Sequence, residues 1–465
     1  MKEPLITIIH RYEERLFNKK TSWFLRIAIY CFLFILYVLF AMHRALYLLF
    51  APHSKSFYMS ARQNTDGTWA DSYHKHIELQ RGVRFFSLST MLMIVVSSVA
   101  LLTVMQVIFP ATDTEPVQAA DNTYTVINNN NAGVGSLRTA INSANAAVGT
   151  VEIVFDIIGT NEISLVTALP DLTNDVTFTN NEIAPVRIDG SGLAASTDCW
   201  EIASGAEGTT VVGMAFVDCT GSGLVVSADS VTIGGSATAD NVYAYGNGSN
   251  GVSITGSSTI VQHLYSGWPL VLGGTDGNTG SGLYISGDDN TIDAVVALQN
   301  GDYGVHIDSG ADGNTITNSF IGVRSTLSSS NVGNTSDGIR VEGDNTNIGT
   351  AGNGNVVSQN GAQGIHIISA SGAEITDNSI GVNEDEDEVK SNDQAGVYLD
   401  SATSASISQN TISGNTGAGI YIDGGSGHTI FSNYIGTNSA NVSLGNQTYG
   451  VLVEHGATST TIGGP

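Results

Sequence analysis

A recurring motif carries, at one repeated position, side chains that could bind a ligand. Nine glycines are each followed by an apolar, a variable and a second apolar residue, at steps from 22 residues (Gly282 to Gly304) to 34 residues (Gly304 to Gly338). In a β-strand the two apolar side chains face the core, and the variable side chain between them faces solvent. From the third to the eighth motif, that outward residue is a ring or a guanidinium: Tyr284, His306, Arg340, His366, Tyr398 and Tyr421.

The next outward position, two residues further on, is often acidic. Rings stack on sugars and carboxylates accept sugar hydroxyls, so the two columns together predict a shallow glycan-binding face. Calcium bridging between neighbouring acids extends this hypothesis, because it would relieve like-charge repulsion. The alternative is that Tyr simply suits exposed strand positions. The candidate metal ligands are Asp308, Glu342, Asp400, Asp423 and Glu454.

Catalytic groups are less evident. Gly287-Asp288-Asp289 offers the carboxylate pair that glycoside hydrolysis needs, but it reads more simply as a turn. A uronate lyase needs basic side chains, and only five Lys and Arg follow residue 110. The histidines lack the spacing of a zinc site. We therefore assign no catalytic residue and no cofactor other than the calcium considered above, and the sequence favours a non-catalytic protein.

The elements that would position these columns are short strands. Between the motif glycines runs a second pattern, apolar-x-x-Asn-x-apolar, as at Asn378, Asn410 and Asn433. Strand-rich repeats of this length form stacked coils that share one core, and we predict an all-β, right-handed parallel β-helix over residues 121–465. The Asn residues are expected to occupy left-handed turns and to stack their amides from coil to coil.

The first coil needs a cover, because its strands would otherwise be an open edge. Ser136 is a suitable helix N-cap, and Leu137, Ala140, Ile141 and Ala144 fall on one helical face. An N-terminal capping helix is therefore predicted here.

Charge divides the chain into two parts. Residues 1–110 hold 12 basic and 6 acidic residues; the other 5 basic and 37 acidic residues give residues 111–465 a net charge of −32. Nucleic acid is excluded as a partner of the second part, because phosphate binding requires a surplus of Lys and Arg.

The first part is expected to be a membrane module, residues 1–110. Two hydrophobic segments, about 23–41 and 91–109, are each long enough to cross a bilayer. A basic loop lies between them and should be cytoplasmic, which places residues 121–465 outside the cell membrane after a linker at 111–120. Alternatively, the second segment is a signal sequence cleaved near Ala119, which would release a secreted protein.

Residues 121–465 resemble right-handed β-helix repeat proteins of bacterial surfaces and secretions, which share the pectin-lyase-like fold. The first element of that family often reads Cys-Ser-Leu-Arg-Glu-Ala; here Gly135 replaces the Cys and Thr139 the Glu. The segments 153–156, 168–170 and 187–193 are also similar to the family. The same fold hosts lyases, hydrolases, epimerases and adhesins.

The resulting prediction is a membrane-anchored, outward-facing, non-catalytic β-helix that acts as an adhesin, a stalk or a binder of cell-surface glycans. The alternative is a polysaccharide-active enzyme, either a glycoside hydrolase, a lyase or an epimerase. Cys199 and Cys219 are either a disulfide between adjacent coils or two small core residues. Residues 461–465 lack a cap, so the β-helix is expected to be incomplete at its C-terminus.

Overall fold

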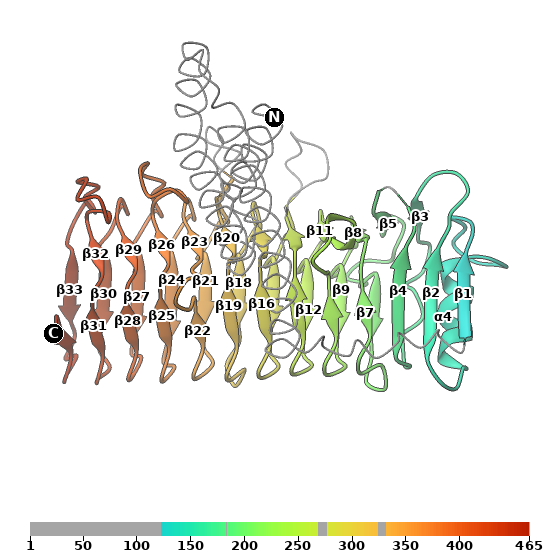
Figure 1. Cartoon of the computed structure of the whole chain (residues 1–465), viewed down its shortest axis with the longest axis horizontal. Helices are drawn as coiled ribbons and strands as arrows, with labels where there is room; N and C mark the ends of the chain where they lie inside the picture. Colours follow the sequence, from blue (N-terminus) through green and yellow to red (C-terminus); the bar gives the residue numbers. More distant parts are fainter. Residues whose placement is uncertain (1–121, 183, 268–276, 324–331, 465) are drawn as a thin grey trace, which may run out of the picture. The chain divides into compact units, whose positions relative to one another are not determined.

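The structure, a computed structural model, describes residues 122–182, 184–267, 277–323 and 332–464. Within these ranges the chain winds into a stack of coils whose strands form three parallel sheets, so the prediction of an all-β parallel solenoid is confirmed (Figure 1). Apart from the two end strands of each sheet, every strand pairs with strands of the preceding and following coils, as β15 (Leu283–Ile285) does with β12 (Val252–Ile254) and with β18 (Val305–Ile307).

The strands follow one another in spatial order within each sheet. The 13-stranded sheet contains β1 (Asn122–Val126), β2 (Val151–Phe155), β4 (Val176–Asn180), β7 (Thr210–Val211), β10 (Thr232–Ile233), β13 (Ile260–Gln262), β16 (Thr291–Asp293), β19 (Thr315–Thr317), β22 (Asn347–Ile348), β25 (Glu374–Thr376), β28 (Ser406–Ser408), β31 (Thr429–Phe431) and β34 (Thr461–Ile462). The 11-stranded sheet contains β3 (Glu162–Ser164), β5 (Val186–Asp189), β8 (Met214–Val217), β11 (Val242–Tyr245), β14 (Leu264–Ser266), β17 (Val296–Ala297), β20 (Phe320–Ile321), β23 (Val356–Val357), β26 (Ser379–Ile380), β29 (Thr411–Ile412) and β32 (Tyr434–Ile435).

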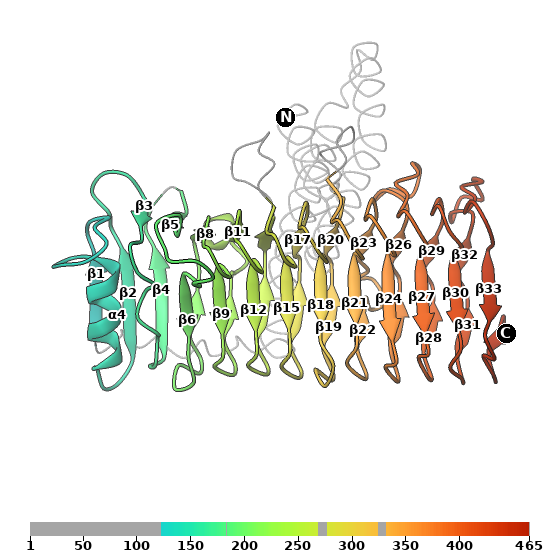
Figure 2. The same ribbon diagram turned by 180° about the vertical axis from the view of Figure 1, so that it is seen from behind.

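The 10-stranded sheet carries the glycine motifs. Figure 2 shows its strands side by side along the stack. They are β6 (Trp200–Ile202), β9 (Leu224–Val226), β12 (Val252–Ile254), β15, β18, β21 (Ile339–Val341), β24 (Ile365–Ile368), β27 (Val397–Asp400), β30 (Ile420–Asp423) and β33 (Val451–Glu454).

Alternation along the strands builds one continuous core. In β15, β18 and β21 the two outer residues are buried and the middle one is half-exposed, as the glycine motif predicts. The coil interior near β6 is aromatic: Trp200 lies between Phe178 and Phe216, at centroid distances of 5.4 and 6.3 Å. Its indole Nε1 donates to the carbonyl oxygen of Pro170 at 3.0 Å, so the polar end of the ring is satisfied.

Asparagines, most of them buried, connect the coils, which confirms the predicted stacking of amides. In each ladder the Nδ2 of one Asn donates to the Oδ1 of the Asn in the next coil, at 2.8–3.0 Å. One ladder comprises Asn247, Asn278, Asn300, Asn334, Asn360, Asn392, Asn415 and Asn446, and the other Asn355, Asn378, Asn410 and Asn433.

The expected left-handed conformation of these asparagines is wrong. The residue just before the ladder Asn often takes it instead, with φ of 59° at Gln299, 63° at Gln359 and 64° at Asp377. This preceding residue turns the chain, so the Asn side chain can point inward and bond to the next coil. The two functions that the sequence assigned to one residue are therefore divided between neighbours.

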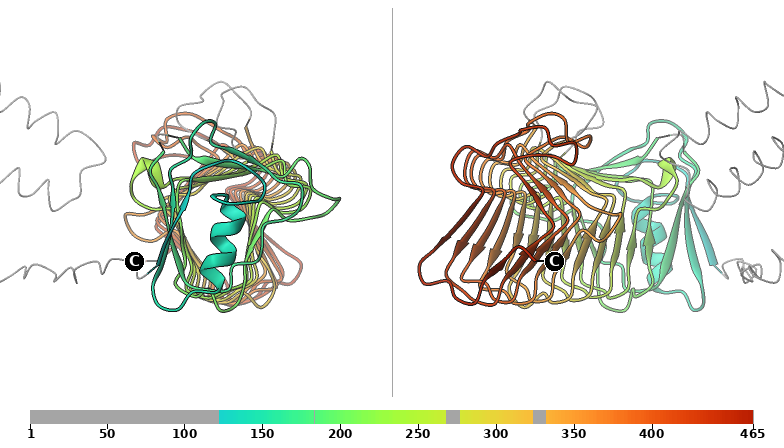
Figure 3. Two further views of the ribbon diagram at one scale, coloured as in Figure 1. Left: turned by 90° about the vertical axis from the view of Figure 1, so that its right-hand side faces the viewer. Right: turned by 60° about the vertical axis from the view of Figure 1, so that its left-hand side comes forward.

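A helix, α4 (Leu137–Asn145), lies at the β1 end of the stack (Figure 3). Ser136 caps it by accepting a hydrogen bond from the Thr139 amide at 3.3 Å. Its buried residues are those of the predicted apolar face, and the helix packs against β1 and β2. Arg138 donates to the carbonyl oxygens of Thr167 and Ala168, both at 2.7 Å.

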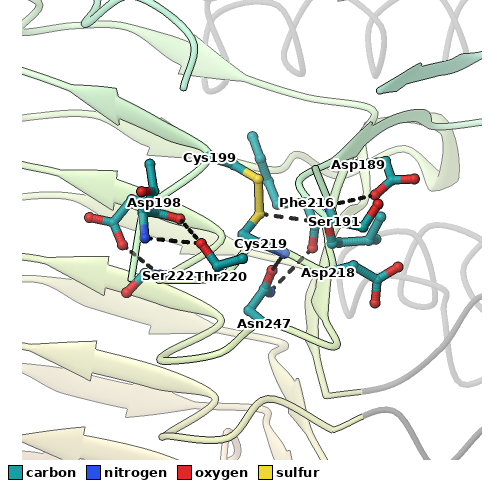
Figure 4. Close-up of a disulfide and its surroundings, with 12 residues drawn as sticks. Asp189, Ser191, Asp198, Cys199, Phe216, Asp218, Cys219, Thr220, Ser222 and Asn247 are labelled. Atoms are coloured by element: carbon teal, nitrogen blue, oxygen red, sulfur yellow. Dashed lines mark hydrogen bonds between the residues drawn. A yellow bond between two sulfur atoms is a disulfide. The ribbon is translucent and has the colours of Figure 1, made fainter. Parts of the chain in front are cut away.

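A disulfide joins Cys199, just before β6, to Cys219, just after β8 (Figure 4). The two Cα atoms are 5.5 Å apart and the residues are separated by 20 positions. Of the two interpretations that the sequence left open, the bridge is therefore the one found. The amide of Cys219 also donates to Oδ1 of Asn247 at 3.0 Å, so the bridge adjoins the first residue of the longer Asn ladder.

The predicted membrane module and linker lie outside the described residues. Within the residues that are described, no helix combines the length and the apolar character that a bilayer span requires.

Candidate functional site

The six predicted outward residues occupy equivalent positions on six adjacent strands of the 10-stranded sheet. Tyr284 pairs with His306, and the series continues in register to Tyr421. All six residues are partly buried, and the His366 side chain is only 12% exposed. The structure therefore brings them into one column, which we call the outward column; it consists of Tyr284, His306, Arg340, His366, Tyr398 and Tyr421.

The C-terminal half of the outward column is a stack of rings. His366 and Tyr398 lie 4.6 Å apart between centroids at an interplanar angle of 24°, and Tyr398 and Tyr421 lie 4.8 Å apart at 12°. Each ring thus covers a face of its neighbour. The ring faces between His366 and Tyr421 are therefore turned towards neighbouring rings of the column.

The tyrosine hydroxyls of this stack are bound to carboxylates. Tyr398 donates to Oδ2 of Asp423 at 3.0 Å, and Tyr421 donates to Oε2 of Glu454 at 3.2 Å. Desolvation, followed by the hydrogen bond to Glu454, raises the pKa of Tyr421 to about 12. Desolvation and then the hydrogen bond to Asp423 also raise the pKa of Tyr398. Both phenols consequently stay protonated as hydrogen-bond donors well above neutral pH.

The N-terminal half of the outward column forms a polar cluster instead of a stack. Tyr284 donates its hydroxyl to Oδ2 of Asp308, and the Arg340 Nε donates to Oε1 of Glu342 at 2.7 Å. The imidazole of His306 lies between these pairs and meets Tyr284 edge to face, with centroids 5.3 Å apart. We call Tyr284, His306, Asp308, Arg340 and Glu342 the polar cluster.

Two further residues adjoin the polar cluster and were not predicted. Tyr303 contacts the His306 ring at 5.0 Å and lies 5.2 Å beneath the Arg340 guanidinium. Asp337 accepts a hydrogen bond from Nδ1 of His366 at 3.0 Å and is nearly buried. Both directly precede a motif glycine, where the turn meets the strand, so strand alternation does not predict their direction. A ring or a carboxylate before the motif glycine is the one signal that could have indicated them.

The environment of the polar cluster shifts its titratable groups. The hydrogen bond to Asp308 is the main cause that raises the pKa of Tyr284 to about 12, and the same bond lowers the pKa of Asp308. Burial lowers the pKa of His306. At neutral pH the imidazole of His306 is therefore neutral, and Asp308 is a carboxylate that accepts the Tyr284 hydroxyl.

Three side chains of the polar cluster offer donor atoms to a common point. One ligand atom each from His306, Asp308 and Glu342 lie within 4.8 Å of one another, and no other such trio of His, Cys, Asp or Glu occurs in the described ranges. Asp400, Asp423 and Glu454, the other predicted metal candidates, lie in register on successive strands. They are not part of such a group.

The Gly287-Asp288-Asp289 segment is a turn, as the simpler interpretation held. Asp289 has a φ of 55°, and Oδ1 of Asp288 accepts the Asp312 amide of the next coil at 2.8 Å. Asp312 repeats the contact with the Asp344 amide at 2.8 Å. These carboxylates satisfy backbone donors between coils.

Residues 278–464 match the family described as "Periplasmic copper-binding protein (NosD)", a range that contains the whole outward column. No curated protein matches the sequence significantly.

Comparison with solved structures gives several matches at low sequence identity. The A-module of the mannuronan C-5 epimerase AlgE4 from Azotobacter vinelandii is 14% identical with a TM-score of 0.47, and the match covers 74% of this chain and 100% of that one. The AlgE6 A-module from the same organism is 15% identical with a TM-score of 0.49, covering 74% and 99%. The Dettilon tailspike protein is 11% identical with a TM-score of 0.42, covering 68% and 64%. The family match and the three-sheet coil confirm the resemblance to parallel β-helix proteins: the chain contains a parallel β-solenoid whose residues 278–464 match the NosD family.

Proposed function

We propose that residues 121–465 form a right-handed β-helix that is exposed outside the cytoplasm and binds polysaccharide along the outward column without transforming it. The observation that carries the proposal is the alignment of six ring and guanidinium side chains on six adjacent strands of one sheet. An extended polysaccharide is itself a repeating chain, so a repeated row of donors, acceptors and ring edges offers it a matching series of contacts. Carboxylates beside the row would accept sugar hydroxyls.

The location outside the cytoplasm has three supports. The Cys199–Cys219 disulfide belongs to an oxidising compartment. The family matched by residues 278–464 is described as periplasmic. The hydrophobic segments 23–41 and 91–109 would hold the protein at the cell membrane, or the second segment would direct its secretion.

The helix α4 takes the role of an N-terminal cap in this proposal. Its four buried residues would cover the apolar interior at β1 and β2, which the helix contacts. The edge that β1 presents would otherwise invite pairing with another chain. The right-handed sense follows from the strong preference of parallel strand connections for that hand.

A glycan array probed with the full chain tests the binding function. Once a ligand is found, Tyr398→Ser with Tyr421→Ser should weaken binding at least about tenfold, because the edge contacts and both hydroxyls are lost. The matched control is Tyr243→Ser with Tyr265→Ser, a pair stacked at 5.1 Å on the 11-stranded sheet. An array without any signal, or equal loss in both double variants, would contradict the proposal.

A second function is favoured by the polar cluster. A Tyr–Asp hydrogen bond, an imidazole and a guanidinium lie together there, and such groups can move protons and hold a carboxylate in an enzyme that acts on polysaccharide. Release of reducing ends or unsaturated uronates from a polysaccharide panel would favour catalysis. Binding without release, together with unchanged stereochemistry of the sugars, would favour the non-catalytic function.

Copper, which the family description names, fits this chain only in part. Cu(I) prefers thiolate and thioether ligands. Among the described residues, the cysteines form a disulfide and the one methionine, Met214, is buried in the core. The imidazole and carboxylates of His306, Asp308 and Glu342 are instead suited to divalent ions, including Cu(II).

A further inference from the structure

The geometry points to a site for a divalent transition-metal ion, Zn²⁺ or Cu²⁺, formed by His306, Asp308 and Glu342. The three residues lie on β18, just after it, and just after β21. The rigid register of two paired strands therefore fixes the distances between them.

The donor separation fits a single ion. Nε2 of His306 and Oε1 of Glu342 are 3.4 Å apart, which is longer than an N–H···O hydrogen bond. Two donors that bind one ion at about 2.1 Å with a tetrahedral angle are separated by about 3.4 Å. The third donor, from Asp308, lies within 4.8 Å of both, so a small adjustment of its side chain completes the set.

An unsatisfied atom marks the same place. Nε2 of His306 is shielded from solvent and has no hydrogen-bond partner. A buried polar atom without a partner is costly, and it faces two carboxylates, as a metal-binding imidazole nitrogen does. A bound ion would satisfy it.

The local charge also favours a cation. Asp308, Glu342 and the nearby Asp337 carry three negative charges, against the single guanidinium of Arg340. Nε of Arg340 already donates a hydrogen bond to Oε1 of Glu342, but the carboxylate has further lone pairs that can bind an ion. The Tyr284 hydroxyl likewise donates to Oδ2 of Asp308. This bond orients the Asp308 carboxylate, as supporting hydrogen bonds orient the ligands of metal sites.

The donor types decide between classes of ion. Calcium takes six to eight oxygen ligands, whereas one imidazole and two carboxylates suit zinc or Cu(II). Three protein ligands leave a coordination position open for water or another ligand. His306 also belongs to the outward column, but the metal site does not include Tyr398 or Tyr421, whose variants test glycan binding.

The test is a titration of the chelator-treated full chain with Zn²⁺ by calorimetry and with Cu²⁺ by electron paramagnetic resonance. His306→Gln and Glu342→Gln should each weaken Zn²⁺ binding at least about tenfold, the loss seen even when only supporting residues of a metal site are changed. Nitrogen coupling of the bound Cu²⁺ should also disappear in His306→Gln. His366→Gln serves as the control, because this neighbouring outward imidazole bonds to Asp337 instead.

Comparing the metal affinities of His306→Gln and His366→Gln separates binding at this site from binding at other histidines of the chain. Equal weakening by His306→Gln and His366→Gln would overturn the inference, as would less than twofold weakening by both His306→Gln and Glu342→Gln. Calcium binding as strong as Zn²⁺ binding, if it persists in His306→Gln, would identify a carboxylate site. This result would also overturn the inference. If His306→Gln lowers the thermal stability of the protein, Glu342→Gln and Asp308→Asn carry the test.

Discussion

The side-chain amide of Asn300 donates from Nδ2 to Oδ1 of Asn334, 34 residues later in the chain, at 2.8 Å. Oδ1 of Asn300 in turn accepts from Nδ2 of Asn278 at 2.9 Å, and all three side chains are buried. Each amide is therefore both donor and acceptor in a line parallel to the stack. Such a line fixes the register between coils of different length, because a shifted coil would leave buried amides without partners.

Asn300→Ala should destabilise the protein by about 1 kcal/mol for each ladder hydrogen bond that is lost. The bonds lost are the one that Nδ2 of Asn278 donates and the one that Oδ1 of Asn334 accepts; Nδ2 of Asn278 keeps the carbonyl oxygen of Ala244, and Oδ1 of Asn334 keeps the backbone amide of residue 300. Denaturation of the full chain in guanidinium, followed by circular dichroism, measures the loss. The exposed Asn130→Ala is the control, and an equal midpoint for both variants would contradict the role assigned to the ladder.

The Cys199–Cys219 bridge should protect its two thiols from alkylation. The chain has three cysteines, so mass spectrometry should find one alkylated residue before reduction and three afterwards. Because the bridge closes a loop of about 20 residues, its removal by Cys199→Ala with Cys219→Ala should cost about 3 kcal/mol of stability. Alkylation of Cys199 and Cys219 in the unreduced protein would contradict the bridge.

Alkaline pH should loosen the C-terminal ring stack. The pKa of Tyr421 is raised to about 12 in the folded protein, whereas an unfolded tyrosine titrates near 10. A group with a raised folded pKa contributes stability that is complete below about pH 10 and is lost as the pH rises towards 12. Tyr398 acts in the same direction.

The melting temperature of the wild type should therefore fall between about pH 10 and 12, and fall less steeply in Tyr421→Phe. The exposed Tyr449→Phe is the control, because it should keep the wild-type slope. Parallel slopes for all three proteins would show that the phenols of the stack do not control this transition.

Much of the fold follows from the sequence because two periodicities agree. The alternation in Gly-apolar-x-apolar determines which side chains face the core, and the repeat length requires stacked coils. The same alternation correctly placed Tyr284 and Tyr421 on one outward column. The recurring Asn of the second pattern indicated the amide ladder, although the left-handed turn belongs to the residue before the Asn.

The chemistry of the column was less predictable. Alternation gives the direction of a side chain but not the rotamer, so it did not reveal that Tyr398 and Tyr421 cover each other's faces. It also applies only within a strand. Tyr303 and Asp337 lie at turns, where the backbone leaves the alternating path, and their contacts with His306 and His366 depend on how two coils meet.

The motif glycine itself has a steric role that its recurrence did not explain. Gly338 lies where a Cβ would approach Nδ2 of Asn360 to 2.6 Å and the carbonyl oxygen of Gly364 to 2.7 Å. Both distances are shorter than real Cβ contacts allow, and the second atom belongs to the backbone of the next coil. The glycine is thus required by close stacking of coils against the Asn ladder.

Gly338→Ala should consequently separate two coils or displace Asn360, at a cost of about 1–3 kcal/mol, as for other overpacked sites. The control is Gly445→Ala, where a Cβ would meet no atom within 4 Å, and where alanine should be neutral or slightly stabilising because it restricts the unfolded chain. Guanidinium midpoints of the two variants provide the measurement. If Gly338→Ala were as stable as Gly445→Ala, the coils would have to be able to move apart without loss of the Asn360 hydrogen bonds, and the steric explanation of the motif would fail.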